Sequence, residues 1–464
     1  MLHCRSHSFL RRSPLNPFNV LIIGAGPAGE AASKAVRRLV SPVAAGRSEP
    51  PRNVQITLVE KEEAGGLCLN RGCIPSKTLL EHVRRRTQVG LPVEWAEIQA
   101  AKKAVIQGIR SQLESSLKSN NIQLLRGTAR FHDRSTVEID APDGRKLVRF
   151  DKAILTAGTE TVLPPPLDKF KEGLLDSDRM LEVSKTPASL TVIGGGAVGC
   201  EFACLLHAAG SKVTIVEMTD GLLPGEDPAI VAALTRSFEA RGIVIKTGVR
   251  VTAVERAGET WKLTLSNGET IESEQTLVSA GRGPRFEALG LDRAGVEADR
   301  RLVVNEFLQT TNPDVYAAGD VAGTRLAHAA AAQGEVAAAN ALGGSKLYDG
   351  SAVPRCLYSW PEVASVGAWK YEREKDNLPV RATRAFFQGS AKAHAAGEID
   401  GFVQIVSDPT DGRILGAQII GAHATELIHI FSVALKKDMT TAELADVMFA
   451  HPTLGETIRE AARR

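Results

Sequence analysis

One glycine pattern occurs twice in this 464-residue chain, and it constrains the fold more than any other feature. The first copy places Gly24, Gly26 and Gly29 between the apolar run "NVLII" and the helical run "EAASKAVRRL", and the pattern returns 170 positions later. The first glycine allows a tight turn, the second lets a pyrophosphate approach the backbone, and the third lets helix and strand pack together. The sequence therefore predicts an α/β protein with two Rossmann-like dinucleotide-binding domains.

Each glycine copy is followed by a strand that ends in an acid. The second copy, Gly194, Gly196 and Gly199, leads to "KVTIVE", which ends at Glu217, 18 residues after the last glycine. The first leads to "VQITLVE", which ends at Glu60 after a segment, "SPVAAGRSEPPRN", that we interpret as an inserted surface loop. A carboxylate at this place accepts hydrogen bonds from ribose hydroxyls. Glu217 repels a 2′-phosphate and "MTDGLL" offers no basic residue to bind one, so the second site should prefer NAD to NADP.

Two dinucleotide folds in one chain suggest a flavoprotein that also uses a nicotinamide. In support, "TTNPDVYAAGDV" predicts a strand ending at Asp320, where an acid can bind a ribitol chain or a phosphate-side hydroxyl. The runs "LTAGTE" and "LVSAGRGP" contain Gly158 and Gly281 and are interpreted as crossovers between the two nucleotide domains.

The last part of the chain has a different character. From about Ala352, strand-like runs with an Asp-Pro-Thr-Asp-Gly turn are followed by the helical segments "ATELIHIFSVALKKD" and "TAELADVMFA". This predicts an α+β dimerisation domain without a nucleotide fingerprint. The predicted organisation is a disordered lead-in at 1–18, a first dinucleotide-binding domain at 19–156 and 281–350, a second at 157–280, and the dimerisation domain at 351–464.

Two cysteines lie close together in the glycine-rich stretch "GGLCLNRGCIPSK", at Cys68 and Cys73. Only six cysteines occur in the whole chain, which argues against a secreted disulfide scaffold and for a reducing, cytoplasmic setting. There, a close pair is usually a metal site or a redox couple. The other cysteines do not supply a convincing second pair for a zinc site: Cys4, Cys200, Cys204 and Cys356. Cys200 and Cys204, one helical turn apart in an apolar run, are predicted to be small buried hydrophobes.

Composition excludes some classes of partner. The formal net charge is +2 with no long single-sign block, which argues against nucleic acid or a membrane surface as the main partner. The N-terminal stretch "MLHCRSHSFLRRSPLNPF" has weak marks of a mitochondrial transit peptide, but a disordered lead-in is the preferred interpretation.

From Val20 to its end the chain resembles the pyridine nucleotide-disulfide oxidoreductases, and within them the dihydrolipoamide dehydrogenase branch. Two specific motifs carry this resemblance: "GGLCLNRGCIPSK" and the C-terminal "HPTLGE", which runs from His451 to Glu456. The resemblance implies FAD under the first fingerprint and NAD under the second. It also implies a homodimer in which the C-terminal domain of one subunit completes the active site of the other.

The resemblance also assigns roles to the cysteine motif. Cys68 and Cys73 should form a redox-active disulfide, with Cys68 as the outer, interchange thiol and Cys73 facing the flavin. Lys77 should lie by the flavin and pair with Glu201, and a cation there favours the reduced, anionic flavin. Further residues assigned to cofactor binding are Lys61, Gly127, Gly158, Leu326, Ala327, His328 and Gly281.

His451 is the expected acid–base group, since a substrate dithiol must lose protons before it attacks. Glu456 would hold its imidazole. An alternative is that Thr453-x-x-Glu456 is only a capping box of the final helix. Both roles could coexist only through different carboxylate oxygens or conformers.

The implied reaction is oxidation of protein-bound dihydrolipoamide to lipoamide, with electrons passing through the cysteine pair and FAD to NAD, and the implied partner is a lipoylated carrier protein. Phe449, Arg71 and Trp360 depart from the branch's usual pattern, and the first two could reshape the substrate channel. The alternatives are glutathione- or trypanothione-type reductases, which usually use NADPH, and mercuric reductase, whose C-terminal cysteine pair this chain lacks. A protein that keeps the fold only to bind lipoyl carriers is a non-enzymatic alternative.

Overall fold

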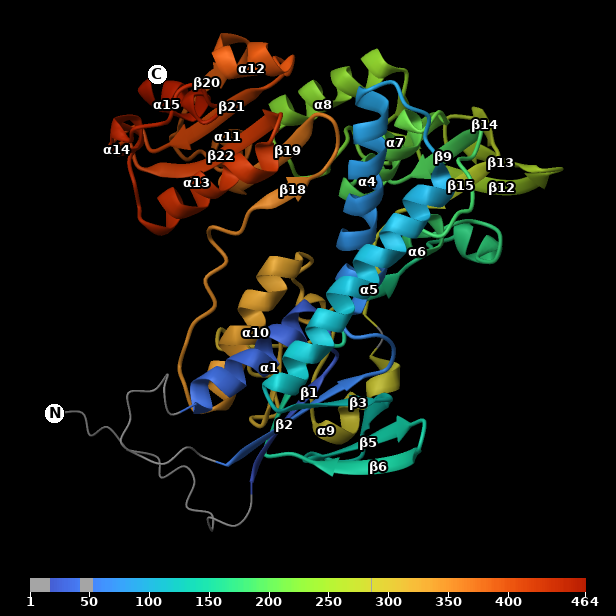
Figure 1. Ribbon diagram of the computed structural model, residues 1–464, viewed down its shortest axis with the longest axis vertical. Coiled ribbons are helices and arrows are strands. Elements are labelled where there is room, and N and C mark those ends of the chain that lie inside the picture. Colours follow the sequence, from blue (N-terminus) through green and yellow to red (C-terminus); the bar gives the residue numbers. More distant parts are fainter. Residues whose placement is uncertain (1–16, 42–52, 285) are drawn as a thin grey trace. The chain divides into compact units, whose positions relative to one another are not determined.

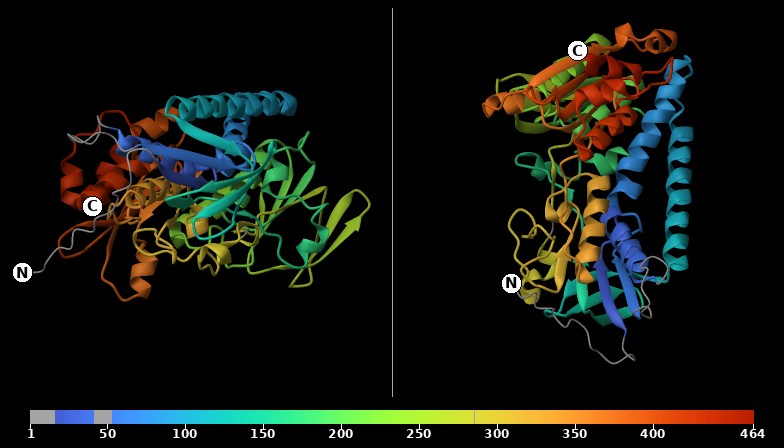
Figure 2. Two further views of the ribbon diagram at one scale, coloured as in Figure 1. Left: turned by 90° about the horizontal axis from the view of Figure 1, so that it is seen from below. Right: turned by 90° about the vertical axis from the view of Figure 1, so that its left-hand side faces the viewer.

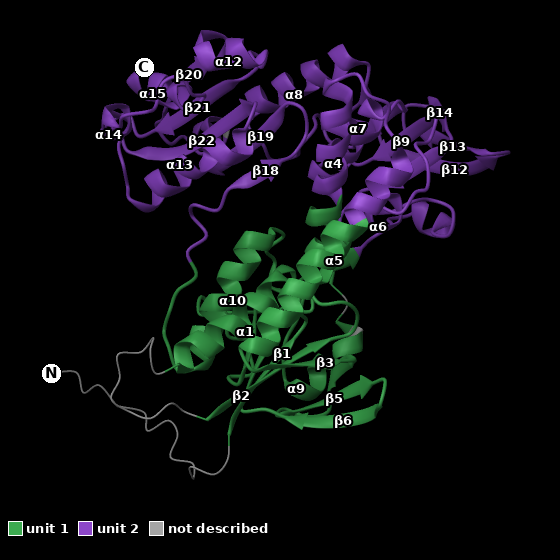
Figure 3. Ribbon diagram, viewed as in Figure 1, with its two compact units in different colours: residues 1–75, 103–160, 282–348 green, residues 76–102, 161–281, 349–464 purple. Residues whose placement is uncertain are grey.

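The computed structural model describes residues 17–41, 53–284 and 286–464. The predicted lead-in and inserted loop lie outside the described residues, apart from the residues that flank the gaps. The chain divides into two compact units, coloured in Figure 3. Unit 1 comprises residues 1–75, 103–160 and 282–348, and unit 2 comprises 76–102, 161–281 and 349–464. The three-domain assignment made above stays a prediction.

Unit 1 is built on a parallel sheet with the strand order β17-β7-β1-β2-β3. The central β1 has the apolar run Val20–Ile23 fully buried, as expected for a parallel strand covered on both faces. A second, antiparallel sheet has the order β4-β5-β6. The strands are β1 (Phe18–Ile23), β2 (Val54–Glu60), β3 (Ile122–Arg126), β4 (Thr128–Phe131), β5 (Thr136–Ala141), β6 (Gly144–Arg149), β7 (Lys152–Leu155), β16 (Arg282–Gly283) and β17 (Val315–Ala317).

Two helices, α1 (Pro27–Val40) and α10 (Ala327–Ala341), lie side by side in unit 1 (Figures 1 and 2). They can approach this closely because residue 334 is glycine. A Cβ there would lie 2.2 Å from the Ala28 carbonyl oxygen. The other helical segments of the unit are α3 (Gly66–Arg71), η2 (Glu287–Leu289), α9 (Leu291–Ala294) and η3 (Asp320–Ala322). The helices α4 (Cys73–Gln88) and α5 (Trp95–Ser119), and the short β8 (Glu160–Thr161), include residues of both units.

Unit 2 contains a second parallel sheet with the order β11-β10-β9-β15 and an antiparallel sheet β12-β13-β14. Helix α7 follows β9 directly, as the second glycine pattern predicts. The elements are η1 (Leu167–Phe170), α6 (Ser177–Met180), β9 (Ser189–Ile193), α7 (Ala197–Ala208), β10 (Lys212–Val216), α8 (Pro228–Arg241), β11 (Val244–Lys246), β12 (Val251–Ala257), β13 (Thr260–Leu265), β14 (Thr270–Ser273) and β15 (Gln275–Val278).

The C-terminal part of unit 2 is an antiparallel sheet of order β18-β19-β22-β21-β20, and α13 packs on β19 and β22. Its elements are β18 (Arg355–Leu357), β19 (Glu362–Gly367), α11 (Lys370–Lys375), β20 (Arg381–Phe386), η4 (Phe387–Gly389), α12 (Ala391–Ala396), β21 (Phe402–Ser407), β22 (Ile414–Gly421), α13 (Ala424–Lys436), α14 (Thr441–Asp446) and α15 (Glu456–Arg463). The predicted strands and helices are present, but the second predicted helix ends at Asp446, because Val447 has extended backbone with ψ 134°.

Among the described residues, no helix is both long enough and apolar enough to cross a membrane. The fold class predicted from the glycine patterns is confirmed: two glycine turns each join a parallel strand to a helix, and an α+β part follows.

Candidate active site

The first glycine turn joins β1 to α1 in unit 1. Gly24 has φ +105°, and a Cβ there would collide with the Thr156 carbonyl, so the position requires glycine. A Cβ at Gly29 would overlap the Gly24 carbonyl. Gly26 precedes the first residue of α1, whose opening N–H groups have no partner within the helix. The turn thus has the geometry that places a phosphate at a helix N-terminus.

The second glycine turn, in unit 2, repeats this geometry. Gly194 again has φ +105°, and a Cβ there would lie 2.6 Å from the Ser279 carbonyl oxygen. A Cβ at Gly199 would overlap the Gly194 carbonyl, while one at Gly196 would meet nothing within 4 Å. The space beside Gly196 is therefore available to a ligand at the start of α7.

A hydroxyl group supports each turn from the neighbouring parallel strand. Thr156 Oγ1 donates to the Gly24 carbonyl at 2.8 Å, and Ser279 Oγ donates to the Gly194 carbonyl at 3.0 Å. Sequence reasoning did not single out these two residues. The signal was present, because each begins a Thr/Ser-Ala-Gly run, ending at Gly158 in the first crossover and at Gly281 in the second.

The acids that end β2 and follow β10 are hydrogen-bonded to the backbone of the two glycine turns. Glu60 Oε2 accepts from the Ala25 N–H at 2.8 Å, and Glu217 Oε2 accepts from the Gly195 N–H at 2.6 Å. Both side chains are buried, and the other oxygen of Glu217 accepts from the N–H and the hydroxyl of Thr219, each at 2.8 Å. A carboxylate has about four acceptor positions, so each acid is fixed beside its turn and keeps the capacity to accept a ribose hydroxyl.

The two motif cysteines lie on consecutive helices: Cys68 on α3, and Cys73 as the first residue of α4. Both side chains are half-buried. The loop is seated on the first glycine turn, since the Gly65 N–H donates to the Ala25 carbonyl at 2.8 Å. A Cβ at Gly66 would lie 2.7 Å from the Gly26 Cα, so glycine is needed for this contact. The cysteine motif and the first glycine turn therefore form one structural group in unit 1.

Lys77 and Glu201 form an ion pair in unit 2, with Lys77 Nζ 2.7 Å from Glu201 Oε2. This is the pair that the resemblance implied. The side chain of Glu201 is 8% exposed, and its other oxygen accepts from the Tyr358 N–H at 3.1 Å. The Lys77 ammonium also lies 4.7 Å from the centre of the Tyr358 ring. Tyr358 is thus a third member of this group that sequence reasoning missed, and burial raises its pKa to about 12.

His451 and Glu456 also meet, with His451 Nδ1 3.0 Å from Glu456 Oε1. Glu456 Oε2 accepts from the Thr453 N–H at 2.9 Å. Glu456 therefore contacts the imidazole and the Thr453 backbone through different oxygens. The alternative capping box is not formed: α15 begins at Glu456 with Gly455 before it, and the Thr453 hydroxyl donates to the Ala450 carbonyl. The Thr453 N–H and then the imidazole of His451 hold the pKa of the Glu456 carboxyl below its usual range.

Asp320 follows β17, as predicted for the ribitol-binding acid. Its Oδ2 accepts from the Thr159 hydroxyl at 2.9 Å, and burial raises the pKa of the carboxyl. Arg282 donates to the Thr159 carbonyl at 2.8 Å. Gly158, beside this group, has φ +70°, and a Cβ added to it would meet nothing within 4 Å, so a ligand has room there.

The remaining predicted cofactor residues are placed as follows. Gly281 has φ +128° with an open Cβ side, Gly127 donates its N–H to the Glu60 carbonyl at 2.9 Å, and Lys61 is exposed. The three other residues assigned to cofactor binding lie at the start of α10: Leu326, Ala327 and His328.

The residues that depart from the family pattern make the following contacts. Arg71 forms an ion pair with Glu62. Phe449 packs in the C-terminal core, and Trp360 donates its backbone N–H to Cys204 Sγ at 3.3 Å. Cys204 is 3% exposed, as predicted for a small buried hydrophobe, and burial raises the pKa of its thiol to about 11. Cys200 is also buried. Within the described ranges no cluster of histidines, cysteines and acids could hold a metal ion.

The family described as "Pyridine nucleotide-disulphide oxidoreductase" matches residues 18–335, and the family's dimerisation domain matches residues 353–462. The chain therefore belongs to the pyridine nucleotide-disulphide oxidoreductases. It is an oxidoreductase, its cofactors are FAD and NAD, and its C-terminal part is a dimerisation domain.

Individual relatives cover nearly the whole chain. The dihydrolipoyl dehydrogenase of Chlamydia pneumoniae is 36% identical over 459 residues, which cover 96% of each chain. The dihydrolipoyl dehydrogenase of Bacillus subtilis is 34% identical over 457 residues, covering 95% of this chain and 97% of that protein. Among solved structures, LpdA from Mycobacterium tuberculosis is 27% identical and superposes with a TM-score of 0.87, covering 96% of this chain and 99% of that one.

Proposed function

We propose that the chain is a dihydrolipoyl dehydrogenase: it oxidises protein-bound dihydrolipoamide to lipoamide and transfers the electrons to NAD. The observation that carries this proposal is the cysteine motif seated on the first glycine turn, where Gly66 packs against Gly26. A dithiol–disulfide pair at this place lies beside the cofactor-binding turn of unit 1. The full-length relatives named dihydrolipoyl dehydrogenase support the substrate class.

The residues present fit the two dinucleotides. The turn at Gly24 to Gly29, with Glu60 and Asp320, would hold FAD, and the turn at Gly194 to Gly199 with Glu217 would hold NAD. When bound, FAD supplies the two-electron chemistry that links a dithiol to the nicotinamide.

The chain's own residues carry the thiol chemistry. A dihydrolipoyl thiolate attacks Cys68, which breaks the Cys68–Cys73 bond and leaves Cys73 as the departing thiolate. The second substrate thiol then displaces Cys68, so lipoyl disulfide is released and both enzyme sulfurs are reduced. Cys73 begins α4, where the helix N-terminus stabilises negative charge on its sulfur.

His451 takes the proton that the substrate thiol must lose. Its Nδ1 is held by Glu456 Oε1 at 3.0 Å, which leaves Nε2 to exchange the proton with substrate. Glu456 is itself oriented by the Thr453 N–H, so the imidazole is fixed by a carboxylate that cannot rotate without losing a second bond. In a homodimer, His451 of the partner subunit would serve the cysteine pair of the first.

The Lys77–Glu201 pair has an electrostatic role. Lys77 places a positive charge one helical turn after Cys73 on α4, and Glu201 with the Tyr358 ring fixes the ammonium. A fixed cation stabilises negative charge that develops on a reduced cofactor nearby.

The partner is a lipoylated carrier protein, such as a 2-oxoacid dehydrogenase acyltransferase or a glycine-cleavage carrier, and we place the enzyme in the cytoplasm on its low cysteine content. Purified enzyme should reduce NAD with dihydrolipoamide, and assays with several lipoylated carriers would identify the physiological one. Reduction of glutathione disulfide or mercuric ion without dihydrolipoamide oxidation would instead support the alternative disulfide reductases.

A further inference from the structure

A side-chain amide crosslinks the loop that carries the two cysteines. Asn70 lies on α3 between Cys68 and Cys73. Its Nδ2 lies 3.2 Å from the Glu63 carbonyl oxygen, 3.1 Å from that of Ala64 and 2.8 Å from that of Gly66. One amide group therefore ties the middle of the motif to the backbone that enters it. The six-residue α3 is too short to be stable by itself, so such contacts determine its position.

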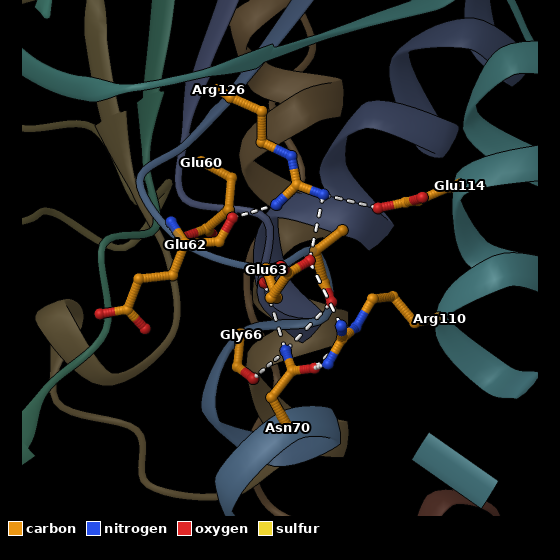
Figure 4. Close-up of polar contacts among 9 residues, drawn as sticks. Glu60, Glu62, Glu63, Gly66, Asn70, Arg110, Glu114 and Arg126 are labelled. Carbon is orange, nitrogen blue, oxygen red and sulfur yellow. Dashed lines mark hydrogen bonds and ion pairs between the residues drawn. The ribbon is translucent and has the colours of Figure 1, made fainter. Parts of the chain in front are cut away.

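The orientation of that amide is set by an arginine from a helix distant in the sequence. Arg110 of α5 donates to Asn70 Oδ1 through Nε at 3.1 Å and through Nη2 at 2.7 Å (Figure 4). A guanidinium has donors only, so the atom that it meets must be the amide oxygen, and the NH₂ group must face the loop carbonyls. Arg110 thereby fixes Asn70 in the one orientation that crosslinks the loop.

A second group of charges lies outside this contact. Arg110 Nη1 lies 3.4 Å from Glu63 Oε2, and Arg126 Nη2 bridges Glu63 at 3.2 Å and Glu114 at 2.7 Å (Figure 4). Glu114 is one helical turn from Arg110 on α5 but does not touch Asn70 in these contacts. The network therefore contains an inner contact to the loop and an outer contact that can be removed separately.

We propose that Arg110 is a positioning residue that sets the disulfide–dithiol equilibrium of Cys68 and Cys73 through Asn70. This inference rests on the proposed function, in which the pair is redox-active. A disulfide forms more readily when its two thiols are held close together, because the loop then loses little conformational freedom on closure. The Asn70 crosslink restricts the reduced loop, so it raises the effective concentration of one thiol for the other and favours the disulfide.

The test equilibrates the FAD-loaded enzyme with dithiothreitol of known reduced-to-oxidised ratio. Dithiothreitol gives two electrons and two protons and closes its own ring disulfide, while the Cys68–Cys73 bond opens to two thiols. Acid quenching, alkylation and mass spectrometry then give the fraction of reduced pairs. Arg110→Met, which keeps the aliphatic stem, should lower the disulfide-to-dithiol ratio about tenfold, equivalent to about 30 mV for a two-electron couple.

Three further variants make the outcome decisive. Glu114→Gln should leave the ratio unchanged, Arg110→Lys should restore part of it, and Asn70→Ala combined with Arg110→Met should add little to Arg110→Met alone. A ratio within twofold of wild type for Arg110→Met, or an equal shift for Glu114→Gln, would overturn the inference. If the wild-type pair fails to equilibrate with dithiothreitol at all, the proposed function itself fails.

Discussion

Replacing His451 by glutamine should slow dithiol oxidation far more than it slows electron transfer from NADH to a dye. A positioned acid–base group typically contributes on the order of 10²–10⁴-fold, and the dye reaction needs no proton from substrate thiols. An ordinary thiol has a pKa of about 8.5, so most of the substrate is protonated near neutral pH and depends on this group.

The structure separates this effect from a loss of folding. The His451 side chain is 73% exposed, and the Thr453 N–H bond to Glu456 Oε2 does not depend on the imidazole. Helix α15 should therefore remain in place, and the thermal midpoint should change by about 2 °C or less. Steady-state rates with dihydrolipoamide and NAD, and with NADH and a dye, measure the two reactions on one preparation. An equal fall in both rates, or a dithiol rate within tenfold of wild type, would refute the assigned role.

Mixed dimers test whether the site is shared between subunits. A dimer of one His451→Gln chain and one Cys68→Ser chain should contain one intact site and one doubly damaged site. Dithiol activity well above that of either mutant homodimer is expected. Activity no higher than theirs would remove the partner subunit from the proposed mechanism.

Three other outcomes are expected. Steady-state kinetics should show a clear preference for NAD(H), because Glu217 repels a 2′-phosphate, and an equal efficiency with NADP(H) would contradict this. Two-electron reduction should give a long-wavelength thiolate-to-flavin absorbance that Cys73→Ser abolishes; a band that survives would show that the two cysteines are wrongly assigned. The Ala188 N–H and then Lys185 lower the pKa of Glu274 from its ordinary value of 4.5, so its folded form binds a proton less readily than the unfolded chain. The ionised Glu274 carboxylate therefore stabilises the folded state fully above pH 4.5, and this stabilisation is lost as the pH falls through the lower folded pKa. The difference in melting temperature between wild type and Glu274→Gln should shrink over that range. A constant difference would contradict the assignment.

The fold was predictable because its main constraints are local in the sequence. A glycine turn needs a strand before it and a helix after it, and all three are contiguous around Gly24 and around Gly194. The pairs Lys77–Glu201 and His451–Glu456 were expected from family motifs, and their contacts are present.

Contacts between segments far apart in the sequence could not be predicted in the same way. Arg110 meets Asn70 only after α5 has packed in unit 1, and nothing in the helical run around Arg110 indicates its partner. Tyr358 likewise joins the Lys77–Glu201 pair through a backbone N–H, which any residue type could supply. The helix predicted to reach Ala450 was too long, because local propensity does not show where the chain turns away at Val447.

The contact between Gly66 and Gly26 has a consequence for how this enzyme is inactivated. Since the cysteine loop rests directly on the first glycine turn, where we propose that the cofactor phosphates bind, neither can shift without disturbing the other. Slow inactivation on storage or heating should then proceed as a single event, with cofactor leakage and exposure of the cysteine loop to proteases following the same time course.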